Sequence, residues 1–242
     1  MNPGPSPELM PVLILAGGLA TRLRPLTERI PKALIDVAGH PFLWHQLKLL
    51  SGNGVRRIVL AVGFLGELVQ QEFGDGSRLG LGLTLDYSFD GPVLLGTAGA
   101  IRRALPMLSA RFFVLYGDSY LPCDYQAVQR GFDEAGLAGL MTVYRNEDAF
   151  DRSNVEYDGC RILQYSKEQR TPRMRYIDYG LGAFERRVFE ALPVNTKIDL
   201  AAVYQDLLAK GQLASYEARD RFYEIGSPEG LRETAEFLKG RG

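Results

Sequence analysis

Short apolar runs alternate with amphipathic stretches along the first half of the chain. Four apolar runs predict buried β-strands at residues 12–15, 57–62, 83–87 and 111–116. Apolar positions with helical spacing predict helices at residues 41–50, 66–73 and 98–108. Strands that alternate with helices indicate an α/β fold with a doubly wound, mostly parallel sheet, which binds its ligands where the strands end.

The second half of the chain shows shorter strands followed by helices. Strands are predicted at residues 137–144, 154–157, 161–165, 178–184 and 223–225, and helices at residues 186–191, 200–210 and from Pro228 onward. We expect this half to form a small mixed β lobe over one side of the crevice. No repeat or linker divides the sequence, which favours a single domain over residues 11–242 after a flexible, proline-rich tail at residues 1–10.

Composition and charge are those of a globular protein and exclude several classes of partner. Hydrophobic residues make up 46% of the chain, charged residues make up 24%, and the net charge is −1. A nearly neutral chain predicts no nucleic-acid or membrane-surface partner, and no apolar run reaches the length of a membrane span. Two cysteines without a C-x-x-C motif, and no signal peptide, favour a cytoplasmic location.

The most informative stretch begins where the first predicted strand ends. Gly17 and Gly18 allow a turn whose N–H groups can approach an anion closely, and the cations Arg22, Arg24 and Lys32 follow. The spacing matches neither G-x-x-x-x-G-K-[ST] nor G-x-G-x-x-G. From the residues alone, a cradle for a polyphosphate and an ordinary turn with surface cations are equally supported.

A carboxylate follows the fourth predicted strand. Asp118 stands directly after Gly117 at the end of that strand, so a parallel sheet would place it in the same crevice as the Gly17–Gly18 turn. A carboxylate on such a loop suits Mg²⁺, which takes one or two carboxylates and shares phosphate oxygens. An aspartate that only stabilises its turn is the alternative that the residues leave open.

Residues 15–27, LAGGLATRLRPLT, together with Pro31 and Lys32, resemble the signature of the sugar-phosphate nucleotidyltransferases, the NDP-sugar pyrophosphorylases. One fixed position departs from it, since Ala20 stands where the family usually has glycine. An ordered match over the whole segment is far more specific than a lone glycine-rich loop. The resemblance implies a Rossmann-like, GT-A-like fold with a nucleotide-binding half at residues 11–135 and a sugar-phosphate half at residues 136–242.

The resemblance also implies roles for single residues. The catalytic residues would be Arg22, Lys32 and Asp118, and Asp118 with Glu224 would bind Mg²⁺. The nucleotide would contact Leu15, Ala16, Gly17, Gly18, Thr21, Arg22, Gly96, Thr97 and Gly117. The segment LGTAGA at residues 95–100 is similar to the family's base-pocket segment, where backbone groups would read a base edge.

Two of the implied positions depart from the family pattern. Glu224 stands where the family has aspartate, so the longer side chain must be compensated by the backbone or bind the metal through water. The alternative is that Glu224 caps the C-terminal helix. Asp178 stands where the family has asparagine, and an ionised aspartate only accepts hydrogen bonds, which indicates a different pattern of sugar hydroxyls.

The expected sugar-phosphate ligands are Lys167, Asp178 and Gly180. Lys167 precedes Glu168, whereas the family has the lysine after the glutamate, and one step along a strand reverses the side-chain face. Either the strand is shifted locally or another cation binds the phosphate. The candidates nearby are Arg161, Arg170, Arg173 and Arg175, and a solvated charged face is the remaining alternative.

The resemblance implies an enzyme that joins a nucleoside triphosphate to a sugar 1-phosphate and releases pyrophosphate. The strings FYEIGSPEG and GDSYLPCDY are similar to heptose 1-phosphate guanylyltransferases, which favours GTP with a heptose or mannose-type phosphate. Transfer of a uridylyl or cytidylyl group is an alternative, as is a non-catalytic regulatory subunit that binds a sugar nucleotide. A glycosyltransferase would require a D-x-D motif after a suitable strand, and we find none. The oligomeric state, including a homo-oligomer, is left open.

Overall fold

The computed structural model of the chain describes residues 8–18, 21–23, 25–91 and 93–240. The predicted tail up to residue 7 and the positions Ala20 and Arg24 lie outside the described residues. Residues 8–10 pack against the domain, because Leu9 is buried and the Met10 N–H donates to Gln129 Oε1 over 2.8 Å. Within these described ranges, no helix combines the length and the apolar character needed to cross a bilayer.

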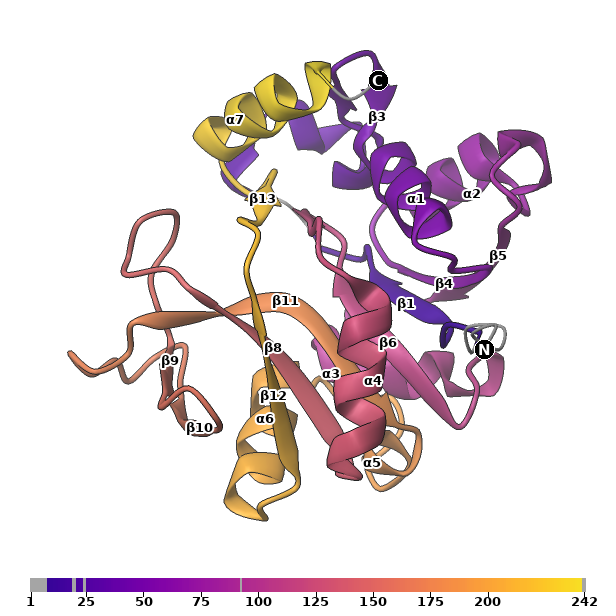
Figure 1. Cartoon of the computed structure of the whole chain (residues 1–242). Coiled ribbons are helices and arrows are strands. Elements are labelled where there is room, and N and C mark those ends of the chain that lie inside the picture. Colours follow the sequence, from indigo (N-terminus) through magenta and orange to yellow (C-terminus); the bar gives the residue numbers. More distant parts are fainter. Residues whose placement is uncertain (1–7, 19–20, 24, 92, 241–242) are drawn as a thin grey trace, which may run out of the picture.

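A nine-stranded sheet forms the centre of the molecule (Figure 1). Strands β5, β4, β1 and β6 are parallel neighbours in that order, with Leu15 opposite both Ala61 and Tyr116. Strand β11 is antiparallel to β6 and β8, and β12 is parallel to β8. The strands are β1 Val12–Leu15, β4 Arg57–Val62, β5 Thr84–Phe89, β6 Arg111–Tyr116, β8 Gly139–Arg145, β9 Val155–Tyr157, β10 Ile162–Tyr165, β11 Tyr176–Glu185 and β12 Leu213–Ala218.

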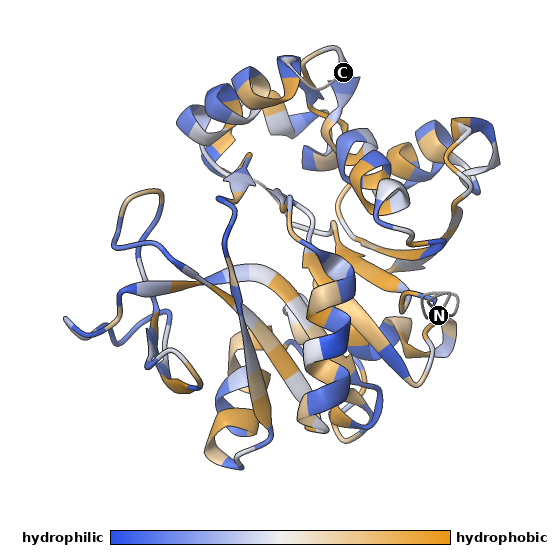
Figure 2. Cartoon of the chain, in the orientation of Figure 1, coloured by the Kyte–Doolittle hydropathy of each residue, from blue (hydrophilic) through white to orange (hydrophobic). Residues whose placement is uncertain are grey.

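Helices cover both faces of this sheet, as a doubly wound fold requires. Helices α1 (Phe42–Gly52), α2 (Gly66–Phe73) and α4 (Tyr125–Ala135) pack on the face that includes Val12 and Ile14. Helices α3 (Gly96–Ala104), α5 (Arg187–Glu190) and α6 (Leu200–Ala209) pack on the face that includes Leu13. The central strands are predominantly apolar because both of their faces are buried (Figure 2).

A third, smaller apolar cluster joins segments from the two ends of the chain. Helix α7 (Pro228–Lys239) packs beside two short strand pairs, β2 (Asp36–Val37) with β3 (His40–Pro41) and β7 (Ser119–Tyr120) with β13 (Tyr223–Glu224). The cluster contains Leu23, Ile35, Val37, Phe42, Tyr120, Ile225 and Leu238. It therefore fixes the segment after the glycine turn, and the segment around residue 224, at the end of β6.

The doubly wound, mostly parallel sheet predicted from the sequence is confirmed, with three differences. Helix α4 and strand β12 were not predicted, although Asp124 gives the N-cap signal of α4 by accepting the Ala127 N–H over 2.9 Å. Strands β8 to β12 all belong to the central sheet, with the β9–β10 hairpin at its edge, so the expected mixed lobe is an extension of that sheet. Helix α3 begins at Gly96, two residues before the predicted start.

Candidate active site

Two neighbouring cavities open where the parallel strands end, and they share Lys32, Tyr116 and Asp118. The first cavity has a volume of about 250 Å³ and is lined by Leu15, Ala16, Gly17, Gly18, Lys32, Ala33, Asp90, Leu94, Gly96, Thr97, Ala100, Tyr116, Gly117 and Asp118. The second cavity, of about 350 Å³, is lined by Arg22, Lys32, Tyr116, Asp118, Ser119, Asp151, Ile177, Asp178, Tyr179, Gly180, Phe222, Glu224 and Gly226.

An ion pair stands on the border between the two cavities. Lys32 Nζ lies 2.9 Å from Asp118 Oδ2, with the lysine side chain only 18% exposed. Lys32 begins a short 3-10 helix (Lys32–Leu34) after Pro31, and Arg22 lies in another (Thr21–Leu23). The predicted grouping of Arg22, Lys32 and Asp118 around one hollow therefore agrees with the structure.

Gln46 holds the turn that carries Asp118. This buried residue of α1 donates from Nε2 to Tyr116 O over 3.2 Å and to Ser119 O over 2.8 Å. Two carbonyls on either side of Gly117 and Asp118 are thereby tied to the same side chain. No local pattern indicates this contact, because 70 residues separate Gln46 from Tyr116.

Glycines allow the strand ends to approach one another closely. A Cβ on Gly117 would lie 2.5 Å from Leu15 O, and one on Gly17 would lie 3.2 Å from the amide nitrogen of Gly63. Among the described residues, none beyond the chain neighbours lies within 4 Å of a Cβ built on Gly18. The predicted nucleotide contacts from Leu15 to Gly18, and Gly117, therefore line one wall of the first cavity. Of Thr21 only the backbone is described.

The opposite wall of the first cavity is fixed by the start of α3. Gly96 has φ +69°, and a Cβ there would lie 2.6 Å from Ile198 O. Thr97 Oγ1 accepts the Leu200 N–H over 2.6 Å, and Ile198 O accepts the Ala98 N–H over 2.9 Å. Gly96 and Thr97, two of the predicted nucleotide contacts, line the first cavity, and the segment before α6 holds them in position.

Asp90 is a functional candidate that the sequence reasoning missed. It follows β5 directly, lines the first cavity and is 5% exposed. Burial raises the pKa of its carboxyl, an effect that the Leu95 amide and the Arg103 charge partly offset. The signal that could have found it was the one used for Asp118, a carboxylate immediately after a parallel strand.

Asp118 and Glu224 form a pair of carboxylates that suits a divalent cation. Strand β13 pairs with β7, and the Ile225 N–H donates to Asp118 O over 2.9 Å. Burial raises the pKa of the Glu224 carboxyl, and the negative charge of Asp118 adds to this shift. A cation would relieve that repulsion, and Mg²⁺ takes such a set of one or two carboxylates. Among the described residues, no cluster of three or more His, Cys, Asp and Glu offers a metal site.

The structure also answers whether Glu224 caps the C-terminal helix. Ser227 is the N-cap of α7, since its Oγ accepts the Gly230 N–H over 3.0 Å. Glu224 accepts hydrogen bonds from Ser227 Oγ, over 2.9 Å, and from the Gly226 N–H. Glu224 therefore orders the turn before the helix, and its carboxylate remains on the wall of the second cavity.

Asp178 and Gly180, two of the predicted sugar-phosphate ligands, line the second cavity. Asp178 Oδ2 accepts hydrogen bonds from Tyr116 Oη and Tyr165 Oη, both over 3.4 Å, and Oδ1 accepts the Gly180 N–H over 3.1 Å. Burial raises the pKa of the Asp178 carboxyl, and the charge of Lys167 partly offsets this. Gly180 has φ +103°, a conformation that favours glycine.

Lys167 lies at a different cavity, beside the β9–β10 hairpin. Its Nζ is 3.3 Å from Asp199 Oδ1 and 5.7 Å from the centre of the Tyr116 ring. The four arginines considered as substitutes are in ion pairs, Arg161 with Asp158, Arg170 with Asp148, Arg173 with Glu156 and Arg175 with Glu147. None of these five cations lines either of the two cavities described above.

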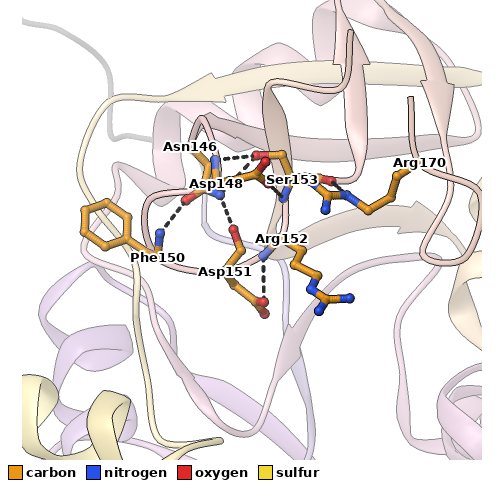
Figure 3. A network of polar contacts seen from close by, with 7 residues as sticks. All are labelled: Asn146, Asp148, Phe150, Asp151, Arg152, Ser153 and Arg170. Carbon is orange, nitrogen blue, oxygen red and sulfur yellow. Dashed lines mark hydrogen bonds and ion pairs between the residues drawn. The ribbon is translucent and has the colours of Figure 1, made fainter. Parts of the chain in front are cut away.

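A loop that is held by a network of polar contacts (Figure 3) carries Asp151, which lines the second cavity. Asn146 Nδ2 donates to Asp151 O over 2.6 Å and to Ser153 Oγ over 3.1 Å. Asp148, at φ +61°, accepts the Ser153 N–H over 2.7 Å and Arg170 Nη2 over 2.5 Å. Several hydrogen bonds therefore fix the loop. No sequence motif around Asp151 predicts that it lines a cavity.

Comparison with known proteins identifies the family. Residues 11–240 match the family model described as nucleotidyl transferase. The chain belongs to this nucleotidyltransferase family. It is 29% identical over 237 residues to the mannose-1-phosphate guanylyltransferase catalytic subunit beta of Danio rerio, and 28% identical over 249 residues to a mannose-1-phosphate guanylyltransferase of Mycobacterium tuberculosis. The alignments cover 96% and 94% of this chain but 63% and 64% of those relatives.

Solved structures support the fold of this family member. A putative glucose-1-phosphate thymidylyltransferase from Bacillus anthracis, in complex with a sucrose, matches with a TM-score of 0.85 at 20% identity over 96% of both chains. HddC from Yersinia pseudotuberculosis, complexed with GMP-PN, matches with a TM-score of 0.80 at 24% identity over 96% of this chain and 100% of that one. The family resemblance and the fold expected from it are confirmed.

Proposed function

We propose that this chain transfers a nucleotidyl group from a nucleoside triphosphate, with GTP favoured, to a sugar 1-phosphate. An oxygen of the sugar phosphate would attack the α-phosphorus, the bond to the bridging oxygen would break, and pyrophosphate would leave with its electrons. The observation that carries the proposal is the Lys32–Asp118 pair on the border of two cavities, since a reaction between two polyanions needs charge where they meet. The guanylyltransferase relatives favour GTP.

Different residues around the border would position different parts of the two substrates. The first cavity would take the base and ribose, and the second would take the sugar phosphate, with Asp178 and Gly180 at its hydroxyls. Lys32 would neutralise the α-phosphate as it gains charge, and Arg22 would hold the β- and γ-phosphates that leave. The nucleophile is already an anion, so catalysis would rest on orientation and charge neutralisation.

Asp118 and Glu224 would hold Mg²⁺ in this reaction. The ion, when bound, offsets charge on the phosphate oxygens. Lys167 remains a candidate ligand of the sugar phosphate, which would require Lys167 to leave Asp199. The cytoplasmic location and a homo-oligomeric state also stay predictions from the sequence.

Release of pyrophosphate tests the proposal. The four nucleoside triphosphates are combined with mannose, heptose and glucose 1-phosphates in the presence of Mg²⁺. We expect release with GTP and one of these sugars, and none without a sugar phosphate. Release from UTP or CTP instead would support the uridylyl or cytidylyl alternative. Binding of GTP without release in any combination would support a regulatory subunit, although that class is expected to lose the phosphate cation or metal carboxylate, and Lys32 and Asp118 are both present.

A further inference from the structure

Gln46 is a buried amide that no step of the proposed reaction uses. It lies on α1 and is 1% exposed, and its Nε2 donates to Tyr116 O over 3.2 Å and to Ser119 O over 2.8 Å. These two carbonyls lie on either side of Gly117 and Asp118. A movement of the turn that carries Asp118 would therefore have to lengthen at least one of the two bonds.

Helix α1 also holds the segment that follows Lys32. His45, the residue before Gln46, is buried, and its Nε2 donates to Val37 O over 2.6 Å. Consecutive residues of one helix thus contact the two segments that supply the Lys32–Asp118 ion pair. The position of Asp118 relative to Lys32 therefore depends on contacts with a single helix.

One atom of the Gln46 amide has no partner. Within the described part of the chain, Gln46 Oε1 is buried and accepts no hydrogen bond. A buried acceptor without a donor destabilises the fold, and each such group in a native protein calls for an explanation. The explanation that the contacts offer is the other end of the same amide, which ties the Asp118 turn at two points.

We propose that Gln46 is a positioning residue for Asp118 as a ligand of Mg²⁺, a role that rests on the proposed function. Mg²⁺ demands nearly ideal octahedral geometry, so a carboxylate that is displaced binds it more weakly. Loss of a residue that orients a metal ligand through hydrogen bonds typically lowers metal affinity or activity by roughly 10- to 100-fold. Gln46 is not among the described residues that line the two cavities, so it acts through the turn.

Replacement of Gln46 by methionine tests this role. Gln46→Met keeps the length of the side chain and removes both hydrogen bonds. Its matched control is Gln129→Met on α4, because Gln129 is also buried and also joins two main-chain groups. Gln129 accepts the Met10 N–H over 2.8 Å and donates to Glu8 O over 3.2 Å. Both substitutions should lower the thermal unfolding midpoint by a few degrees, but only Gln46→Met should affect metal binding.

Two measurements separate metal binding from turnover. Binding of Mn²⁺, a paramagnetic substitute for Mg²⁺, to the enzyme without nucleotide is followed by electron paramagnetic resonance. We expect Gln46→Met to weaken Mn²⁺ binding by roughly 10-fold or more, and to lower the maximal rate of pyrophosphate release by a similar factor. The KM for GTP should stay within about twofold of the wild type, because the first cavity keeps its wall. Gln129→Met should match the wild type in all three quantities.

Every outcome decides for or against the role of Gln46. A folded Gln46→Met with the wild-type Mn²⁺ affinity, or an equal loss of affinity in Gln129→Met, would overturn it, as would a wild type that binds no Mn²⁺. If Gln46→Met fails to fold, Gln46→Asn decides, since it withdraws the amide by one methylene. That variant should weaken Mn²⁺ binding by about threefold or more, and an unchanged affinity would count against the proposal. Weaker Mn²⁺ binding in Gln46→Met, with no pyrophosphate release by the wild type, would overturn the proposed reaction and leave this role standing.

Discussion

The two cavities are lined by different kinds of chemical group. The wall of the first is largely backbone and small side chains, with strand ends, glycines and the start of α3, and Asp90 as its buried charge. The wall of the second includes charged side chains from separate elements, among them Arg22, Asp151, Asp178 and Glu224. The first cavity thus offers a shape of fixed backbone groups, and the second offers a pattern of charges.

This difference matches what each proposed substrate requires. A flat base is recognised by groups at fixed positions on its edge, and backbone near a sheet supplies such groups. A sugar phosphate presents many hydroxyls and a double charge, which side chains from several elements must surround. Substitutions should therefore act in different ways on the two sides, and most strongly on the border that both sides share.

The largest effect is expected at that border. Asp118→Ala and Lys32→Ala should each lower the rate of pyrophosphate release by about 100-fold or more, because each removes a charge that acts on the reacting phosphates. The thermal unfolding midpoint should change little, since the pair is partly exposed. Asp206→Ala is the matched control, because it breaks another lysine–aspartate pair, with Lys210 over 2.7 Å, on α6. A wild-type rate in either border variant would remove that residue from the mechanism.

Two glycines that line the first cavity, Gly117 and Gly18, test how much its wall depends on close backbone packing. Gly117→Ala should lower the free energy of unfolding by about 1–3 kcal/mol, because its Cβ would meet Leu15 O and the turn must shift. Gly18→Ala should leave that free energy within about 0.5 kcal/mol of the wild type, since its Cβ contacts none of the described residues beyond its chain neighbours. It should nevertheless weaken nucleotide binding if the turn holds phosphates. Denaturant unfolding and GTP titration measure the two quantities. Equal stability of both variants would show that the turn adapts, against this account of the wall.

The same contrast explains which features of the fold and the site could be predicted from the sequence alone. The bounds of β1, β4, α2 and β6 were predicted as the structure has them, because buried parallel strands leave continuous apolar runs and short helices leave clear spacing. The first cavity follows from local strings at the ends of these elements. Strand β12 was missed because it mixes polar and apolar residues, and its position depends on pairing with β8.

Most of what the sequence could not predict belongs to long-range contacts. Gln46 reaches the Asp118 turn across the α1–β6 interface, and Asp151 reaches its cavity through a loop closed by Arg170. Neither residue stands in a recognisable string. Asp90 is different, because its position directly after β5 could be predicted from the sequence. A single aspartate after a strand is weak evidence for a functional site until its burial is known.

Glu224→Gln tests the proposed Mg²⁺ site at the second cavity. We expect the Mg²⁺ concentration for half-maximal pyrophosphate release to rise by roughly tenfold, while the maximal rate falls less than in Asp118→Ala, because a neutral amide is a weaker ligand than a carboxylate. The pKa of Glu224 is raised by burial, so protons compete with the metal at a higher pH than for an ordinary glutamate. In the wild type, Mg²⁺ affinity should therefore weaken as the pH falls toward that raised pKa.

Glu224→Gln should lose this part of the pH dependence. Titration of Mg²⁺ from neutral to mildly acidic pH measures both proteins. Identical pH profiles in the wild type and Glu224→Gln would mean that Glu224 does not bind the metal directly.

The smallest effect concerns stability at the sugar side. The pKa of Asp178 is raised by burial, so the folded protein holds the Asp178 proton more tightly than the unfolded chain does. Its contribution to stability is then largest at low pH and is lost as the pH rises from about 3.8 through the raised pKa. Asp178→Asn carries no such proton, so its stability should exceed that of the wild type by no more than about 1 kcal/mol at neutral pH, and the difference should shrink in acid. Urea unfolding across this pH range measures the difference. A wild type that gains stability over Asp178→Asn as the pH rises would mean that its partners, Tyr116, Tyr165 and the Gly180 amide, favour the ionised form more than burial opposes it.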